Sequence, residues 1–286
     1  MNTFQTSAPI TAVIELSVGD IKVNASDRAD CTVSIRPRDE HRQADVRAAE
    51  SAHVEYLNGA LDVKSVKTWL RLVGPSKNDG AVVVEVNLPT DSSVIATTGM
   101  GLVHFEGELA DTDVTAGMGD IRLDHVRALK ARTGLGDVTV DDVAADAKVS
   151  TSSGSLRLGN IAGAATIKNS NGNVDIGQCG RYAHVRASFG NVTIGRALSS
   201  CSVVTAVGDI RIFEVSAGSV TIRTGTGAVT IGVRDGAAAW LELAAKYGSV
   251  RNGLTAAPGP EAADSTVEVR ARTSGGDITV NRATAA

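Results

Sequence analysis

The amino-acid sequence predicts an all-β protein, a single-stranded parallel β-helix (β-solenoid) with about 18 residues per coil and a β-rich N-terminal cap. Three observations predict this fold class. A glycine recurs at a nearly constant interval along most of the chain, and apolar and polar residues alternate on both sides of it. The composition combines 30 Gly with only four Phe, two Trp and three Tyr, so that Val, Ile and Thr carry most of the side-chain bulk, as in β-rich repeat proteins.

The recurring glycine divides the chain into copies. Successive intervals are 18, 17, 18, 18, 18, 18, 19, 21 and 28 residues, and an earlier copy stands at Gly19. A propeller needs periods of about 40 residues, and a sandwich would not hold its spacing so closely over many copies. The glycines that define the copies are Gly101, Gly119, Gly136, Gly154, Gly172, Gly190, Gly208, Gly227, Gly248 and Gly276.

Each copy contains two predicted strands that meet at the glycine. Apolar residues stand two and four positions after it, as Ile121 and Leu123 do after Gly119, and small or apolar residues stand three and five positions before it, as Ala116 and Val114 do. The change from odd to even spacing indicates a corner, and a third apolar position seven residues after the glycine predicts a weaker third side. One coil cannot bury its own apolar face, so coils stacked about 4.8 Å apart would fill a continuous core.

We expect a single β-solenoid domain over residues 1–286, and its segments differ in regularity. The predicted segments are a first coil or strand over 1–23, an irregular N-terminal β segment over 24–93, regular coils over 94–254, and a loop with the last coil over 255–286.

The irregular N-terminal segment would cap the solenoid, because a bare end exposes unpaired backbone groups. Asn58-Gly59 predicts the turn of a hairpin. The expected elements are a strand at 31–35, a helical stretch at 39–51, a hairpin at 53–66, a loop from Trp69 to Gly80 and a strand at 81–89.

The stretch 232–254 has helical propensity, but its residues follow the repeat. Leu241, Leu243 and Ala245 fall on the inward positions of a coil, so we predict a strand there. Residues 257–265 predict a polar loop.

Composition and motifs argue against several classes of function. The formal net charge of −4 is not that of a nucleic-acid or anionic-membrane protein. Cys31, Cys179 and Cys201 lack CxxC spacing and predict buried thiols rather than disulfides or zinc ligands. Fragments such as GMGDIR occupy repeat corners without a following helix, and the His residues are scattered, so we expect no cofactor and no metal.

The N-terminal segment resembles a strand rather than a signal peptide, and no apolar run reaches the length of a membrane-spanning helix. We therefore expect a cytoplasmic protein without an integral membrane segment.

Carboxylates supply the strongest alternative, a polysaccharide-active β-helix enzyme. Adjacent coils can bring Asp124 near Asp141 and Asp142, but the acidic residues share no ladder. Glycoside hydrolysis needs two positioned carboxyl groups, and glycan grooves are usually floored with aromatic rings. We expect a solvated surface and no enzyme. The Asp or Asn that follows several corner glycines is explained by local hydrogen bonds to the backbone rather than by calcium.

The residue before the corner glycine is apolar in several coils. We expect these side chains to turn inward and fill the corner. The alternative is an exposed apolar stripe, which would be an interaction surface. The members of this candidate corner stripe are Met100, Met118, Leu135, Phe189 and Val207, with Tyr247 at the same position of a later coil.

A second candidate interaction patch consists of Trp240, Tyr247, Arg251 and Asn252. Asn252 stands where other coils carry an inward apolar residue. We expect a buried, hydrogen-bonded Asn, and the alternative is a surface that binds a partner.

The copies AGMGDIRL, TGLGDVTV, TSSGSLRL, NSNGNVDI, TAVGDIRI and TSGGDITV resemble the bacterial β-strand-repeat family of unknown function labelled "putative adhesin". The resemblance covers Ala12 to Val280. It implies a right-handed β-helix without established catalytic residues, and many relatives look exported or membrane-linked.

The first functional hypothesis is a non-enzymatic interaction scaffold with a protein partner, since no polar site converges and no small molecule is expected. The second is self-assembly into filaments through coil ends, favoured by the regular C-terminal coil GGDITVNRATAA. The third is the carbohydrate-active enzyme.

Overall fold

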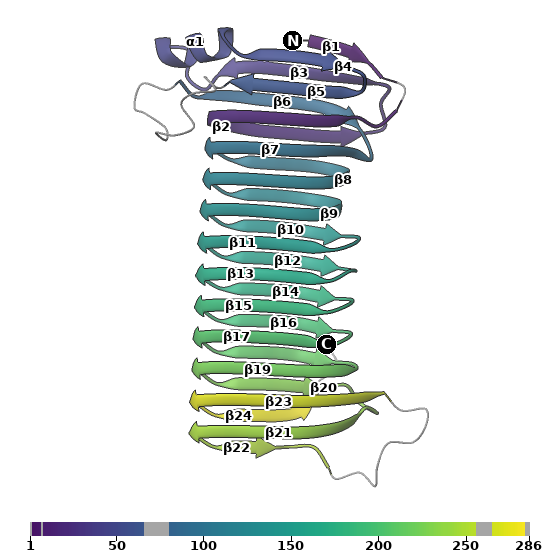
Figure 1. The fold of residues 1–286 in the computed structure, drawn as a ribbon, viewed down its shortest axis with the longest axis vertical. Helices are drawn as coiled ribbons and strands as arrows, with labels where there is room; N and C mark the ends of the chain where they lie inside the picture. Colours follow the sequence, from purple (N-terminus) through teal and green to yellow (C-terminus); the bar gives the residue numbers. More distant parts are fainter. Residues whose placement is uncertain (1, 7, 66–79, 256–264, 284–286) are drawn as a thin grey trace. The chain divides into compact units, whose positions relative to one another are not determined.

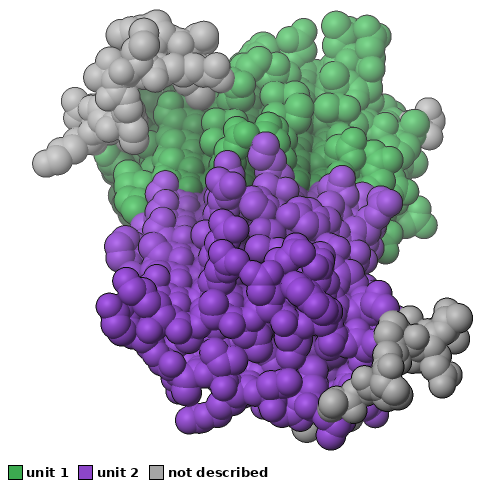
Figure 2. Space-filling model, turned by 60° about the horizontal axis from the view of Figure 1, so that its bottom comes forward, with its two compact units in different colours: residues 1–142 green, residues 143–286 purple. Residues whose placement is uncertain are grey.

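A computed structural model of the chain describes residues 2–6, 8–65, 80–255 and 265–283. Two compact units make up the chain, residues 1–142 and residues 143–286 (Figure 2). In both units nearly all the described backbone lies in strands that wind into parallel coils, which confirms the all-β solenoid. The predicted loops from Trp69 to Gly80 and over 257–265 fall almost wholly outside the described residues.

Unit 1 contains ten strands and one helix among its described residues (Figure 1). In chain order they are β1 (Asn2–Gln5), β2 (Thr11–Ser26), β3 (Asp30–Pro37), α1 (Gln43–Glu50), β4 (His53–Leu57), β5 (Ala60–Ser65), β6 (Val82–Pro89), β7 (Ser92–Met100), β8 (Val103–Met118), β9 (Ile121–Leu135) and β10 (Val138–Val143), which ends at the unit boundary.

Strand β2 supplies both sides of one coil in unit 1. Its first half pairs in parallel with β5 and β7, and its second half pairs in parallel with β6 and β8. The coil made of β5 and β6 therefore pairs with one edge of β2, and the coil made of β7 and β8 pairs with the other edge (Figure 1). In the chain, however, β5 and β6 come after β2 and before β7. Strands β4, β3 and β1 then add to this end in antiparallel directions.

The N-terminal cap contains the predicted hairpin and helix. Asn58 and Gly59 both have positive φ, 51° and 78°, and join β4 to β5 in a two-residue turn. Helix α1 contacts β3 and β6. Its Asp45 is only 2% exposed and accepts hydrogen bonds from the backbone N–H groups of Ala81 (3.0 Å) and Asp39 (3.2 Å), which ties the helix to the start of β6.

Unit 2 contains strands only, among its described residues. In chain order they are β11 (Ala147–Ser153), β12 (Leu156–Ile161), β13 (Ala165–Asn171), β14 (Val174–Cys179), β15 (Ala183–Phe189), β16 (Val192–Ala197), β17 (Cys201–Val207), β18 (Ile210–Val215), β19 (Gly218–Thr226), β20 (Val229–Val233), β21 (Ala238–Tyr247), β22 (Val250–Asn252), β23 (Thr266–Gly275) and β24 (Ile278–Arg282).

The regular coils of unit 2 stack in parallel with the register that the repeat predicts. Ile167 lies opposite Val185, and Ile176 opposite Ile194, each pair 18 residues apart. The inward side chains of these coils are buried, including the third-side residue Cys179. Each column of the repeat is therefore a ladder in the core.

The last coils of unit 2 do not stack in chain order. Strand β23 pairs with β19 on one side and β21 on the other, and β24 lies likewise between β20 and β22 (Figure 1). The predicted C-terminal coil is thus an interior coil, and the expectation that it forms an exposed end is wrong. The coil of β21 and β22 is outermost in unit 2. The 28-residue interval between Gly248 and Gly276 supplies enough residues for the chain to leave β22 and form the next coil between β19–β20 and β21–β22.

The corner glycines lie directly on one another. Gly119 has φ of 139°, and a Cβ there would meet the carbonyl oxygen of Gly101 at 1.9 Å, so only glycine fits. Buried threonines close the inner side of the corner: the Thr98 hydroxyl donates to the carbonyl of Gly19, and the Thr133 hydroxyl donates to that of Gly119, both at 3.1 Å.

The Asp and Asn residues after the corner glycines form a ladder between coils. Asn173 Oδ1 accepts from the N–H of Asn191 (3.0 Å), and Asn191 Oδ1 accepts from the N–H of Asp209 (2.9 Å). The prediction of side-chain to backbone bonding is correct in kind, but the bonds are not local, because the acceptor faces the N–H of the next coil.

Candidate interaction surfaces

The candidate corner stripe of unit 1 is exposed. Met100, Met118 and Leu135 are 37%, 38% and 52% exposed. Met100 lies opposite Met118, and Met118 lies opposite Leu135, on β7, β8 and β9. These three side chains form a contiguous apolar row on the surface of unit 1, which we call the corner row.

The expectation that these side chains turn inward is wrong. The inner space of the corner is already taken by residues three positions before the glycine, such as Thr98, Ala116 and Thr133, which are buried. Strict alternation would turn the residue just before the glycine inward, like those three and five positions before it. Its exposure shows that the alternation breaks between Thr133 and Leu135, before the glycine is reached.

The corresponding positions in unit 2 are apolar only in part. Phe189 and Val207 lie opposite each other and are 57% and 44% exposed. Thr226 and Gly275 occupy the next two coils in space, followed by Tyr247, which is 70% exposed. In unit 2 the apolar side chains before the corner glycine are therefore one adjacent pair, Phe189 and Val207, and Tyr247, which is separated from that pair by two coils.

The second candidate patch is divided between the two strands of the outermost coil. Trp240 and Tyr247 belong to β21, whereas Arg251 and Asn252 belong to β22. Trp240 is 54% exposed, and the Arg270 guanidinium lies 5.6 Å from its ring centre.

Charged residues surround Trp240 on the outer face of β21 and β23. Glu242 pairs with Arg272 at 2.6 Å and with Arg270 at 3.4 Å, and Arg270 also pairs with Glu268. The Arg272 hydrogen bond lowers the pKa of Glu242 from its ordinary value. This network holds β21 against β23.

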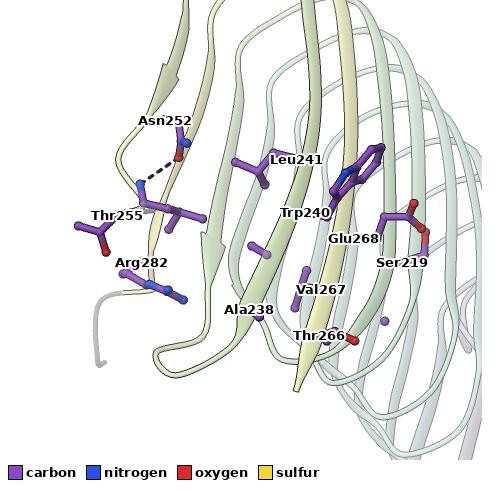
Figure 3. Close-up of a pocket in the computed structure, with 13 residues that line it drawn as sticks. Ser219, Ala238, Trp240, Leu241, Asn252, Thr255, Thr266, Val267, Glu268 and Arg282 are labelled. Atoms are coloured by element: carbon purple, nitrogen blue, oxygen red, sulfur yellow. Dashed lines mark hydrogen bonds between the residues drawn. The ribbon is translucent and has the colours of Figure 1, made fainter. Parts of the chain in front are cut away.

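An open hollow of about 810 Å³ lies at the outermost coil, lined by Trp240, Leu241 and Asn252 of that coil and by residues of neighbouring coils such as Val267 and Arg282 (Figure 3). The expectation that Asn252 is buried is wrong: it is exposed, and its Oδ1 accepts only a local bond from the N–H of Leu254 (2.9 Å). In the described part of the chain no coil pairs with the outer edge of β21 and β22. Side chains at the inward positions of this coil are therefore accessible to water.

Several acidic residues of unit 1 form ion pairs between neighbouring coils. Asp111 pairs with Arg127 at 2.9 Å, Asp113 pairs with Lys130, and Asp142 lies 3.4 Å from His125. Among the residues that the structure describes, no group of three or more His, Cys, Asp or Glu side chains is arranged to hold a metal ion.

The three cysteines are free and buried, as predicted. Burial raises the pKa of Cys31 to about 11 and that of Cys201 to about 12, and it also raises the pKa of Cys179. Thiols with these pKa values stay protonated at neutral pH and react slowly.

No helix within the described ranges is long and apolar enough to cross a membrane.

These features define a class of protein, a repeat β-solenoid with exposed rows of side chains on an otherwise regular surface. The family model described as Toastrack DUF4097 matches residues 12–281. The chain belongs to this family.

Several solved structures match the chain at low sequence identity and low TM-score. A "putative adhesin" from Bacteroides fragilis is 12% identical, with a TM-score of 0.38 over 98% of this chain and 95% of that chain. One from Parabacteroides distasonis is 14% identical, with a TM-score of 0.37 over 97% and 95%. A protein from Clostridium sporogenes described as a cell adhesion protein is 10% identical, with a TM-score of 0.25 over 98% of each. No curated protein matches the chain.

Proposed function

We propose that the protein is a non-enzymatic scaffold that binds a protein partner through the corner row of unit 1. The observation that carries the proposal is the exposure of Met100, Met118 and Leu135 in register on three consecutive coils. Three large apolar side chains side by side leave a large part of their surface in water, and a partner that covers this surface would gain its burial.

The residue types of the corner row suit a protein interface. Methionine and leucine carry no charge, and methionine is enriched in interface cores, where its flexible side chain adapts to a partner. The strands beneath the row pair in register from coil to coil, so the backbone that presents the row is already ordered and loses little entropy on binding.

The proposal is tested by replacing the row while keeping the fold. The triple variant Met100→Ser, Met118→Ser and Leu135→Ser is compared with native protein as bait in lysate of the source cell, followed by binding measurements with each purified candidate. A partner that binds the native chain should bind the variant at least about tenfold more weakly.

A matched control replaces three exposed apolar residues elsewhere, Tyr182→Ser, Leu198→Ser and Phe213→Ser. We expect the control to bind the partner like the native chain. Equal binding by all three proteins would contradict the corner row as the binding surface.

Self-association through the outermost coil of unit 2 is a second candidate. Strands β21 and β22 each pair with one neighbour among the described residues, and an unpaired strand edge is a template for pairing with another chain. Val250 on β22 is 45% exposed, which leaves apolar surface for a second copy.

Light scattering after size-exclusion chromatography, over a range of concentrations, tests this candidate. Assembly that grows with concentration and is lost in Val250→Lys would support it, with Val207→Lys as a control at an equally exposed valine. A monomer at all concentrations would contradict it.

A further inference from the structure

A row of cations runs across the outer face of unit 2, and neither candidate function above uses it. Lys168, Arg186, Arg223 and Arg272 occupy the same outward position of β13, β15, β19 and β23. Lys168 lies directly opposite Arg186, and Arg223 lies directly opposite Arg272. We call these four residues the basic row; Val204 of β17 occupies its middle position.

Three members of the basic row have no carboxylate partner. Within the part of the chain that the structure describes, no ion pair involves Lys168, Arg186 or Arg223; Arg186 Nε is 3.0 Å from His184 Nε2. Like charges directly opposite one another on neighbouring strands repel. Such an arrangement lowers the stability of the free protein, and an anionic ligand would relieve the repulsion.

The outer face of unit 1 is neutralised in part, and Arg132, at the position of the basic row on β9, forms no ion pair among the described residues. There Lys130 pairs with Asp113, and Lys64 pairs with Asp62, on the outer faces of β8, β9 and β5. The same solenoid therefore places opposite charges side by side in one unit and like charges side by side in the other.

The net charge of the whole chain hides this difference. Residues 1–142 contain 14 Lys and Arg against 22 Asp and Glu, whereas residues 143–286 contain 14 Lys and Arg against 10 Asp and Glu. The units carry formal charges of −8 and +4, and their sum of −4 conceals a basic unit.

A smooth strip lies beside the basic row. Two residues further along the same strands the side chains are small, and most carry a hydroxyl: Ser170, Ser188, Ala206, Gly225 and Ser274. Beyond the strip stand the corner residues Phe189 and Val207, both exposed. Cations thus line one side of the strip, and an apolar pair lines part of the other.

We propose that the basic row and the adjoining strip bind a linear anionic polysaccharide that runs across the coils. Each coil advances about 4.8 Å, so the cations meet charges spaced along an extended chain. Arg and Lys bind carboxylate or sulfate groups, the serine hydroxyls can bond sugar hydroxyls, and the Phe189 ring offers an apolar face to a sugar ring.

The shape and residue types disfavour other anions. The row is one residue wide and several coils long, which fits a single polymer chain better than a planar lipid surface. Single-stranded nucleic acid is held by aromatic side chains that stack successive bases, whereas the rings of His184 and Phe189 beside the basic row both belong to β15 and do not repeat from coil to coil. The side chains of an acidic peptide carry carboxylates but no hydroxyl groups that would match the serines of the strip.

The test uses full-length protein and fluorescently labelled oligogalacturonates, with binding followed by anisotropy at low ionic strength. We expect binding that weakens as salt rises, because charged contacts are screened. The double variant Arg186→Gln with Arg223→Gln should bind at least about tenfold more weakly. A control double variant, Arg196→Gln with Arg211→Gln, removes two exposed positive charges from β16 and β18 and should change affinity less than about twofold.

Three results would overturn the proposal. The first is no binding of oligogalacturonate at low salt, and the second is an equal loss in the two double variants. The third is tighter binding of single-stranded DNA, poly-glutamate or anionic phospholipid vesicles than of oligogalacturonate, which would assign the basic row to another class of partner. Unchanged melting temperatures in both variants ensure that a loss of binding is not a loss of fold.

Discussion

The N-terminal end of unit 1 and the C-terminal end of unit 2 have the same coil arrangement, but only the first is covered by further strands and a helix. In each, the outermost parallel coil stacks out of chain order: β5 and β6 lie beyond β2, and β21 and β22 lie beyond β23 and β24. The first is covered by β4, β3 and α1, whereas no described residue pairs with the outer edge of the second.

The difference shows in the burial of inward-facing leucines on the two outermost coils. Leu61 on β5 is fully buried, whereas Leu243 on β21 is only half-buried. The same solenoid coil is thus part of the core when it is covered and part of the surface when it is not. Antiparallel strands and a helix make the difference, because they satisfy edges that a parallel coil leaves open.

The largest expected effect separates these two leucines. Leu61→Asp would bury an unpaired charge and should lower the free energy of unfolding by more than about 3 kcal/mol. Leu243→Asp leaves the new carboxylate near water and should cost about 1 kcal/mol or less. Urea denaturation of the full chain measures both, and equal losses would contradict the contrast between the ends.

A smaller effect is expected at the helix that covers the N-terminal end. Asp45→Ala would leave the N–H groups of Ala81 and Asp39 without their acceptor and should cost about 2 kcal/mol. Asp27→Ala, at an exposed position, serves as the control and should change stability by less than about 0.5 kcal/mol. If the two variants melt together, Asp45 does not hold the cap.

The smallest effect concerns acid pH and the uncovered end. The Ser249 N–H hydrogen bond lowers the pKa of Asp277, and Arg272 lowers that of Glu242. A carboxylate with a lowered pKa stabilises the folded state above its unfolded pKa, and this stabilisation is lost as pH falls through the folded pKa. Both carboxylates hold β21 and β22 to the neighbouring coil.

Hydrogen exchange of residues 238–252 should therefore accelerate, relative to an interior strand such as β15, as pH falls from above the ordinary carboxyl pKa to below the lowered pKa values of Glu242 and Asp277, after correction for intrinsic rates. Acceleration that is equal in both segments would contradict a local effect. Glu242→Gln should remove part of the pH dependence.

The repeat made the coils predictable from sequence. Ile176 and Leu243 stand at fixed distances from Gly172 and Gly248, and alternation alone predicted which residues face inward. Even β21, with its helical propensity, was predicted correctly, because its residues follow the repeat and pair in register with β23, which outweighs local propensity.

The order of the coils could not be predicted by the same means. Coils with interchangeable ladders can stack on one another in more than one order, and the only sign in the sequence was the 28-residue interval before Gly276. The exposure of Asn252 follows from that order. Whether Met100 and Met118 face inward or outward depended on where the inward–outward alternation of side chains breaks relative to the glycine. Apolar character alone does not reveal that position. The basic row was missed because charge was summed over the whole chain.

A disulfide cross-linking experiment tests the coil order most directly. Thr221 lies opposite Arg270 in the structure, and Arg270 lies opposite Glu242. Thr221→Cys with Arg270→Cys should therefore form a disulfide under mild oxidation, since adjacent strands place the Cα atoms within bonding range. Thr221→Cys with Glu242→Cys should not, because one coil lies between them. The opposite pattern would show that the coils stack in chain order and would contradict the account.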